Sequence, residues 1–186
     1  MENSNLLILK TKLQGFGALR PEAWEMIVQL CQQTQLKTNE SFIREPGALA
    51  YVTNGLLKEY DSQHRKNPSI INFIGSNQSL ITRKHNQNHY LSAFIPTLVL
   101  HWNYDSLALL YEEFPELKTL YDHLVASYDS QTAFKMLLLE QPTIIQKIQI
   151  FVKQHSDILP LLKKRDIARY MNVDYEYFIR HYSKLL

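Results

Sequence analysis

The stretch from about residue 36 to about residue 101 constrains the fold most, because turn residues interrupt it at short intervals. Its turn or break signals are Pro46-Gly47, Asn54-Gly55, Pro68 and Gly75-Ser76. The segments between them, such as AYVTNGLLKEY, SIINFI, NHYLSAFI and TLVLHWNY, are rich in Tyr, Ile, Val and Phe. Brief strands separated by turn residues are typical of an antiparallel barrel or sandwich. The Asn54-Gly55 pair suits a tight turn or a bulge.

The residues before this region predict a helix with one buried face. Pro21 suits the first turn of a helix, and apolar side chains follow it at three- and four-residue spacing. These side chains are Trp24, Ile27, Val28 and Cys31. We expect this helix to end near Gln35.

The residues after the strand-rich region predict helices only. A short helix is expected over residues 106–114, where Pro115 stops it, and a longer one over residues 116–140. The long helix carries apolar residues at the spacing of a coiled-coil seam, namely Leu117, Tyr121, Leu124 and Tyr128. Pro142 ends this helix and can begin the next. The expected inner side of that next helix is formed by Ile144, Ile145, Ile148 and Phe151.

The closing stretch RDIARYMNVDYEYFIRHYSKL fits the pattern of a helix-turn-helix. Spacing places Ile167, Ala168 and Met171 on the inner face of its first helix, and Phe178, Ile179 and Leu185 on that of its second. Asn172 suits a left-handed turn position, and Val173 is expected to be buried in the corner. Asp174 is expected to cap the second helix by accepting from the amide of Glu176 or Tyr177.

The same pattern leaves polar residues on the outer face of the second helix. Arg suits guanine and Glu can accept from cytosine, so this face can read a DNA groove. The predicted groove-facing residues are Tyr175, Glu176, Arg180 and Lys184. The residues expected to neutralise phosphates beside them are Lys163, Lys164, Arg165 and Arg169. The alternative is a solvated helix face on a hairpin that only packs.

Charge and cysteine content limit the remaining classes of function. The chain has a formal net charge of +2, but residues 141–186 contain eight Lys or Arg against four Asp or Glu. Cys31 is the only cysteine, which precludes an intrachain disulfide and an iron–sulfur cluster and fits a reducing compartment. No apolar run is long enough to span a bilayer, and MENSNLLILK is not a secretory signal. We therefore expect a cytoplasmic protein without membrane association.

The order of these parts resembles the Crp/Fnr family of transcription regulators. The resemblance rests on RDIARYMNVDYEYFIRHYSKL, on FIREPGALAYVTNGLLKEY and on LALLYEEFPEL. It implies an α+β fold with a cyclic-nucleotide-binding-like β-roll and flanking helices over residues 1–115. A dimerisation helix over residues 116–140 and a helix-turn-helix DNA-binding domain over residues 141–186 would follow. The family's base-contacting positions match Tyr175, Glu176 and Arg180, of which Tyr175 departs from the usual basic residue.

Two departures from the family pattern affect its implied function. Members that bind cyclic nucleotides carry a Gly-Glu pair and an arginine followed by a small hydroxyl residue. Here Gly75 is followed by Ser76, and Arg83 by Lys84, so a cyclic nucleotide is not the expected ligand. Arg83 and Lys84 remain weak candidates for contacting another anion. The family's β-hairpin wing has no counterpart after the second helix.

Neither a metal site nor an enzyme is predicted. His85 and His89 have a spacing that suits zinc on a helix, but their segment is expected to be loop and strand, without further ligands. No nucleophile elbow, Gly-rich phosphate loop or paired-carboxylate motif occurs. The sequence therefore predicts a dimeric, DNA-binding regulator that acts on an inverted repeat and needs no cofactor. An effector of unidentified chemistry is left open. The alternative is a ligand-sensing or protein-interaction module of the same fold that has lost DNA binding.

Overall fold

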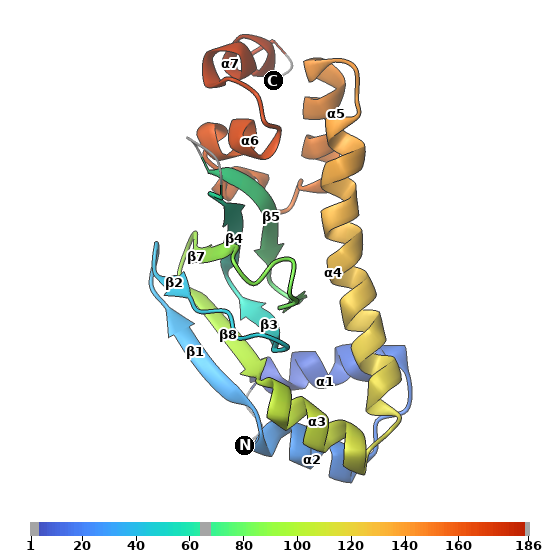
Figure 1. Cartoon of the computed structure of the whole chain (residues 1–186). Helices are drawn as coiled ribbons and strands as arrows, with labels where there is room; N and C mark the ends of the chain where they lie inside the picture. The colour runs from blue at the N-terminus through green and yellow to red at the C-terminus, as the bar shows by residue number, and fades with distance from the viewer. Residues whose placement is uncertain (1–3, 64–67, 185–186) are drawn as a thin grey trace. The chain divides into compact units, whose positions relative to one another are not determined.

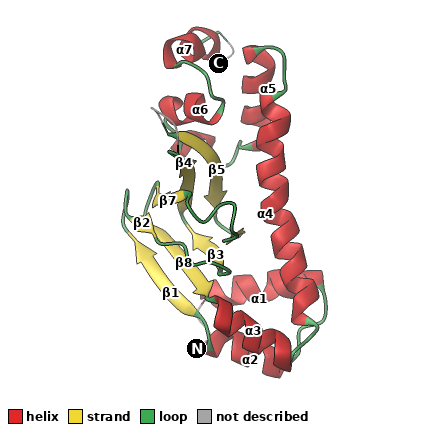
Figure 2. Ribbon diagram, in the orientation of Figure 1, coloured by secondary structure: helices red, strands yellow, loops and turns green. Residues whose placement is uncertain are grey.

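The computed structural model describes residues 4–63 and 68–184, and its fold is α+β (Figures 1 and 2). In these residues the helices are α1 (Ser4–Phe16), α2 (Pro21–Gln29), α3 (Tyr104–Glu113), α4 (Leu117–Leu139), α5 (Ile144–Gln154), α6 (Lys164–Tyr170) and α7 (Tyr175–Tyr182). The strands are β1 (Gln32–Leu36), β2 (Ser41–Phe42), β3 (Leu49–Asn54), β4 (Leu56–Asp61), β5 (Ser69–Gly75), β6 (Gln78–Ile81), β7 (Tyr90–Ala93) and β8 (Thr97–Trp102). The predicted strand-rich region and the predicted long helix are both present.

The strands form two four-stranded sheets, in the orders β1-β8-β3-β6 and β2-β7-β4-β5. In the first sheet β8 pairs antiparallel with both β1 and β3, with Gln32 and Ala50 on either side of His101. The chain passes from the first sheet to the second at Gly55, whose φ is +105°. A Cβ atom there would lie 2.6 Å from the carbonyl oxygen of Pro96, so only glycine fits this corner. The register of β3 against β8 shifts between Val52 and Asn54, which fits the bulge that was one of the two structures predicted for Asn54-Gly55.

The chain divides into two compact units, and β4, β5 and α4 each contribute residues to both. The roll unit comprises Met1–Glu59 and Phe73–Asp129, and the helical unit comprises Tyr60–Asn72 and Ser130–Leu186. The predicted domain limits at residues 115 and 140 stay a prediction.

The roll unit has a continuous apolar core between its sheets and its helices. Trp102 at the end of β8 is 3% exposed, and its indole N–H donates to the carbonyl of Ile27 in α2 at 2.8 Å. Leu9 and Leu13 of α1 and Leu110 of α3 are buried in the same cluster. Amphipathic helices thus close one end of the strands, as Figure 2 shows.

The helical unit has a separate core that is rich in aromatic rings. Phe151 of α5 and Tyr170 of α6 are buried, with ring centroids 5.3 Å apart. Phe178 and Tyr182 of α7 are also buried, with centroids 5.0 Å apart. Thr143 begins α5 with a capping box, since its hydroxyl accepts from the amide of Gln146.

Three expectations from the sequence were wrong in detail. The helix from Pro21 ends at Gln29 rather than near Gln35, because residues 32–36 pair with β8 as strand β1. Ile145 is 42% exposed and therefore does not lie on the inner side of α5. The apolar residues of α4 that have the spacing of a coiled-coil seam do not form an exposed seam. Leu117, Leu124 and Tyr128 are each at most 4% exposed and belong to the core of the roll unit.

Candidate nucleic-acid interface

Helices α6 and α7 and the turn between them form the predicted helix-turn-helix. Asn172 has a φ of +54°, the left-handed conformation that asparagine tolerates better than most residues. The amide of Val173 donates to the carbonyl of Ala168 at 3.1 Å and closes the end of α6. The carboxylate of Asp174 accepts from the amide of Tyr177 at 3.0 Å and caps α7. Local sequence therefore dictates the geometry of the turn.

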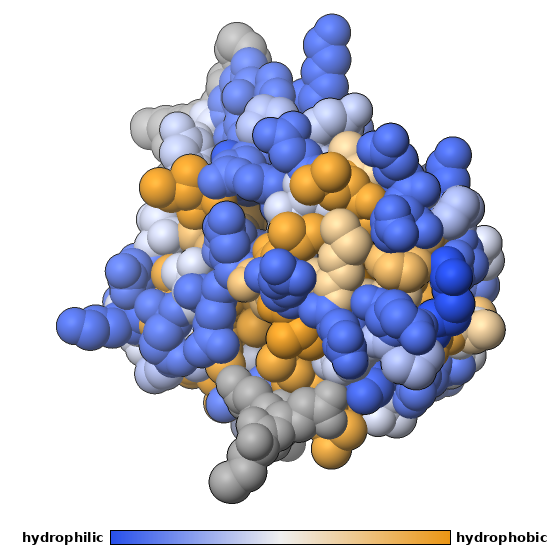
Figure 3. All heavy atoms as spheres, turned by 90° about the horizontal axis from the view of Figure 1, so that it is seen from below, coloured by the Kyte–Doolittle hydropathy of each residue, from blue (hydrophilic) through white to orange (hydrophobic). Residues whose placement is uncertain are grey.

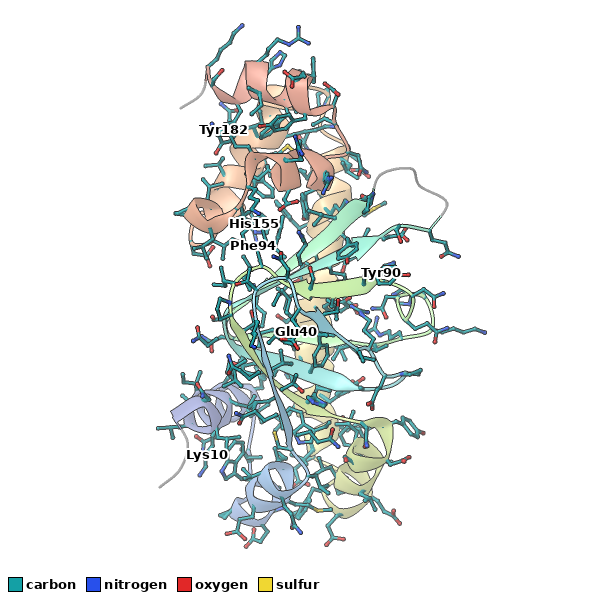
Figure 4. The ribbon with its side chains drawn as sticks, turned by 90° about the vertical axis from the view of Figure 1, so that its left-hand side faces the viewer. Lys10, Glu40, Tyr90, Phe94, His155 and Tyr182 are labelled. Carbon is teal, nitrogen blue, oxygen red and sulfur yellow. The ribbon has the colours of Figure 1, made fainter. Side chains whose placement is uncertain are left out.

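Packing within the helical unit fixes both helices in place. Ile167, Ala168 and Met171 are each 1% exposed, and Phe178 is fully buried, as predicted. Val173 is only half-buried, and Leu185 lies outside the described residues. Figure 4 labels His155, which follows α5, and Tyr182 in α7 among the side chains of this unit. Burial lowers the pKa of His155 to about 4, so its imidazole is neutral at physiological pH.

A series of hydrogen-bonded polar side chains supports the turn between α6 and α7. The ammonium group of Lys135 in α4 is 3.0 Å from the hydroxyl of Ser69 in β5 and donates to it. That hydroxyl in turn donates to the side-chain oxygen of Asn172 at 2.7 Å. Lys135 and Ser69 are buried, and the lysine ammonium also lies 5.3 Å from the ring centroid of Tyr170. The turn is therefore connected by hydrogen bonds to α4 as well as to its own helices.

The outward side of α7 carries the predicted groove-facing residues. Glu176 and Arg180 are one helical turn apart and both are exposed, and Lys184 continues this line just beyond the end of α7. Tyr175 is half-buried, and the guanidinium of Arg165 lies 5.2 Å from its ring centroid. This cation–π contact orients the arginine and shields one face of the tyrosine.

The four flanking basic residues are all exposed and lie on or directly before α6: Lys163, Lys164, Arg165 and Arg169. Arg165 and Arg169 also line an open hollow of about 510 Å³ together with Ser69, Asn172 and Asp174. Arg169, whose side chain is 41% exposed, is 3.8 Å from the carboxylate of Asp166, whose side chain is 7% exposed. Both arginines are exposed beside this hollow and are therefore accessible to an anion.

Tyr177 and His181 are part of the same surface, although the groove-facing pattern in the sequence did not include them. Tyr177 is 41% exposed and its ring centroid is 4.5 Å from that of His181. His181 also contacts the carbonyl of Tyr177 through its Nδ1 at 2.9 Å. The four-residue spacing of Tyr177 and His181 in the sequence could have indicated that the two rings lie next to each other on α7.

The two weak anion candidates in the roll differ in their surroundings. The guanidinium of Arg83 donates two hydrogen bonds to the carboxylate of Asp129 in α4, at 2.9 and 3.1 Å. Lys84 is exposed. Arg83 is therefore paired with a carboxylate of its own chain, and the two cations do not form a joint site for an anion.

A buried ionic network occupies the interior of the roll unit, and no sequence pattern indicated it. Arg44 donates to the carboxylate of Glu59 at 2.7 Å, with side-chain exposures of 2% and 0%. The same carboxylate accepts from the hydroxyl of Tyr128 in α4 at 3.0 Å and contacts Nδ1 of His89 at 3.0 Å. Asn86 donates to the Tyr128 oxygen at 3.0 Å. Burial, reinforced by the charge of Glu59, raises the pKa of Tyr128 to about 12, so it stays a donor.

Two kinds of feature are absent from the described part of the chain. No group of three or more His, Cys, Asp or Glu side chains lies close enough in residues 4–63 and 68–184 to hold a metal ion. Among the helices of the same residues, none has the length and apolar character needed to cross a membrane.

Comparison with solved structures shows which proteins share this fold. FixK2 from Bradyrhizobium japonicum superposes with a TM-score of 0.71 at 18% identity, covering 83% of this chain and 84% of FixK2. A crp/fnr-family transcriptional regulator from Eubacterium rectale gives 0.71 at 12% identity, covering 90% and 83%. The c-di-GMP-responsive global regulator CLP of Xanthomonas campestris gives 0.68 at 15% identity, covering 89% and 91%.

No family model matches the chain, and no curated protein matches its sequence. The superposition on these solved structures nevertheless confirms the predicted resemblance to Crp/Fnr regulators at the level of the fold. The described residues contain the two four-stranded sheets, the long helix α4 and the closing helices α6 and α7.

Proposed function

We propose that this protein is a DNA-binding transcription regulator that acts as a dimer on an inverted-repeat site in the cytoplasm, and is not an enzyme. The observation that carries this proposal is the exposed outward face of α7, held by a left-handed Asn172 and capped by Asp174. Proteins with the same fold include transcriptional regulators.

The chemistry of the α7 face suits the major groove. Arg180 can donate two hydrogen bonds to a guanine, and Glu176 can accept from a cytosine amino group. Both side chains are exposed and stand on one side of a helix whose opposite side is buried by Phe178. The basic residues of α6 flank this face and would neutralise phosphates. Tyr177 is positioned to add a ring contact.

The exposed face of α4 supports dimer formation. One line of exposed residues on this helix recurs at alternating four- and three-residue spacing and consists of Thr119, His123, Ala126, Ser130, Ala133 and Leu137. Met136 and Leu137 are 61% and 60% exposed, which is unusual for large apolar side chains on a helix. Two copies joined along this face would present two helix-turn-helix units to half-sites about 34–36 Å apart, or a multiple of that spacing.

The buried network of the roll supports action without a cyclic nucleotide. A cyclic phosphate requires a guanidinium that is free to pair with it. Arg44 is instead neutralised by Glu59, and Arg83 by Asp129. Displacing Glu59 from Arg44 would leave a buried carboxylate without its ion pair, which costs several kcal/mol.

A mobility-shift titration with a pool of random duplexes, followed by selection of the bound fraction, tests the proposal. The parent is expected to bind saturably and to lose affinity steeply with salt. Arg180→Ala should weaken binding to the selected site by about 1–3 kcal/mol. Lys153→Ala is the matched control, because Lys153 is an exposed cation of the same unit on α5.

Phosphate neutralisation is tested separately from base recognition. Joint replacement of Lys163, Lys164, Arg165 and Arg169 by Gln should reduce the slope of log affinity against log salt by about 0.9 for each phosphate that is no longer neutralised. A parent that shows no saturable, salt-sensitive binding would instead favour a sensing or protein-interaction module of the same fold. Sedimentation of the free protein as a monomer at all concentrations would refute the dimer.

A further inference from the structure

The hollow that Arg165 and Arg169 line carries more positive than negative charge. Among its described lining residues the two guanidinium groups stand against one carboxylate, that of Asp174. This carboxylate already accepts from the amide of Tyr177 as the cap of α7. The face of the roll unit in Figure 3, seen from below, is instead apolar near its middle. The hollow of the helical unit is therefore the better place for an anion.

Asn172 also lines this hollow, and hydrogen bonds behind it set the orientation of its side-chain amide. The ammonium group of Lys135 can only donate, so the hydroxyl of Ser69 accepts from it at 3.0 Å. The hydroxyl then gives its own proton to the side-chain oxygen of Asn172 at 2.7 Å. Reversal of the amide would leave this proton without its acceptor. The oxygen of Asn172 is therefore held toward β5.

The NH2 group of the same amide is left available to a ligand. It makes no hydrogen bond within the part of the chain that the structure describes, and Asn172 is exposed. The backbone conformation alone does not require an amide here, because glycine adopts a φ of +54° without strain. Asparagine thus adds two N–H donors that the turn itself does not use.

A phosphodiester has the chemistry that fits these donors. It carries one negative charge and accepts hydrogen bonds from arginine and from side-chain amides. The hollow is open, as contact with a long polymer requires, and Tyr175 at the start of α7 lines it. A phosphate held there would lie beside the helix face that is proposed to read bases.

We infer that the NH2 group of Asn172 binds a phosphate of the DNA backbone together with Arg165 and Arg169. Lys135 and Ser69 are positioning residues that orient this amide. The inference rests on the proposed DNA-binding function and adds a neutral donor to its cationic surface.

Two substitutions of Asn172 separate phosphate binding from support of the turn. Asn172→Gly allows the left-handed turn and removes the NH2 group. Asn172→Asp keeps an acceptor for Ser69 and replaces the NH2 group by an anionic oxygen. With the duplex selected for the parent, Asn172→Gly should bind about tenfold more weakly, as expected for one lost hydrogen bond to a charged group. Asn172→Asp should bind more weakly still, because its charge repels the phosphate.

The dependence on salt gives a second measurement. A neutral amide releases no counter-ion, so Asn172→Gly should keep the parent's slope of log affinity against log salt, whereas Arg169→Gln should reduce this slope by about 0.9. Gln154→Glu is the control for Asn172→Asp, because it adds the same charge at an exposed position of α5 in the same unit. It should retain nearly the affinity of the parent. Thermal unfolding followed by circular dichroism checks that each variant is folded.

Ser69→Ala tests the orientation of the amide. Binding should weaken at least about twofold, since either orientation of the amide is then allowed. Adding Ser69→Ala to Asn172→Gly should cause no further loss, because the serine acts through the asparagine. An equal loss in both backgrounds would overturn the positioning role.

The outcomes for Asn172 are decisive in either direction. The inference is overturned if the folded Asn172→Gly or Asn172→Asp variant binds as tightly as the parent, or if Gln154→Glu weakens binding as much as Asn172→Asp. Unchanged binding by the Asn172 variants beside a parent with saturable, salt-sensitive binding would leave the proposed function intact. A parent that binds no duplex would overturn both.

Discussion

Replacing Glu59 with glutamine tests the buried network of the roll, because it removes one charge and keeps the size of the side chain. The carboxylate of Glu59 is fully buried and accepts from Arg44 at 2.7 Å and from Tyr128 at 3.0 Å. In the variant the guanidinium of Arg44 stays charged and buried without a counter-ion. We expect a large loss of unfolding free energy.

The size of this loss follows from the burial of the pair. Breaking a buried ion pair from one side costs about 3–5 kcal/mol. The amide oxygen of glutamine can still accept from one of the former donors, which retains about 1 kcal/mol. Glu59→Gln should therefore lower the free energy of unfolding by about 2–4 kcal/mol. Adding Arg44→Met removes the stranded charge and should recover at least about 1.5 kcal/mol of this loss, as a double-mutant cycle would reveal.

The two tryptophans of the chain give a suitable signal for this experiment. Trp24 and Trp102 both belong to the roll unit, so urea unfolding followed by tryptophan fluorescence reports on that unit. A loss below about 1 kcal/mol in Glu59→Gln would refute the reasoning. So would a coupling energy between the two positions that is zero within about 0.5 kcal/mol.

Three further predictions concern single residues. Asp174→Ala removes the cap of α7 and should cost about 1 kcal/mol, with a matching loss of DNA affinity; unchanged thermal unfolding of the helical unit would contradict this. Gly55→Ala should cost roughly 2–5 kcal/mol or prevent folding, because φ is +105° and the new Cβ would clash with Pro96, whereas a fully stable variant would refute the corner geometry. Burial lowers the pKa of His155 to about 4, so its contribution to stability is present above about pH 6.5 and is lost as the pH falls toward 4. His155→Gln should flatten this pH dependence in unfolding followed by circular dichroism.

Local signals made part of the structure predictable from the sequence. Asn172 and Asp174 act within their own turn, and both adopt the predicted conformations. The long helix runs over Leu117–Leu139, within a few residues of the prediction, because prolines mark both ends of the segment. The fold class was implied by the resemblance of this chain to the Crp/Fnr family, and the solved structures confirm it.

Contacts between distant residues account for what the sequence did not reveal. Residues 32–36 have no strong local preference and become a strand because β8 offers them a partner. Arg44, Glu59 and Tyr128 are far apart in sequence, and nothing near any one of them indicates a buried ion pair. The spacing of Leu117, Leu124 and Tyr128 correctly indicated a packed face of α4 but not which part of the molecule packs there. The DNA-contacting residues and the dimer stay predictions.

Leu117 and Leu124 of α4 pack into the core of the roll unit, and this limits how a second copy of the chain can bind to α4. The partner would instead meet the exposed face of α4, where Ala126 and Ala133 are small and Leu137 is the large apolar residue. Helix axes that cross at such small residues approach to about 8 Å, near the lower limit for packed helices. At that spacing a single bulky replacement of either alanine would force the two α4 helices apart. We therefore expect Ala126 and Ala133 to tolerate an increase in side-chain volume less well than the other exposed positions of α4.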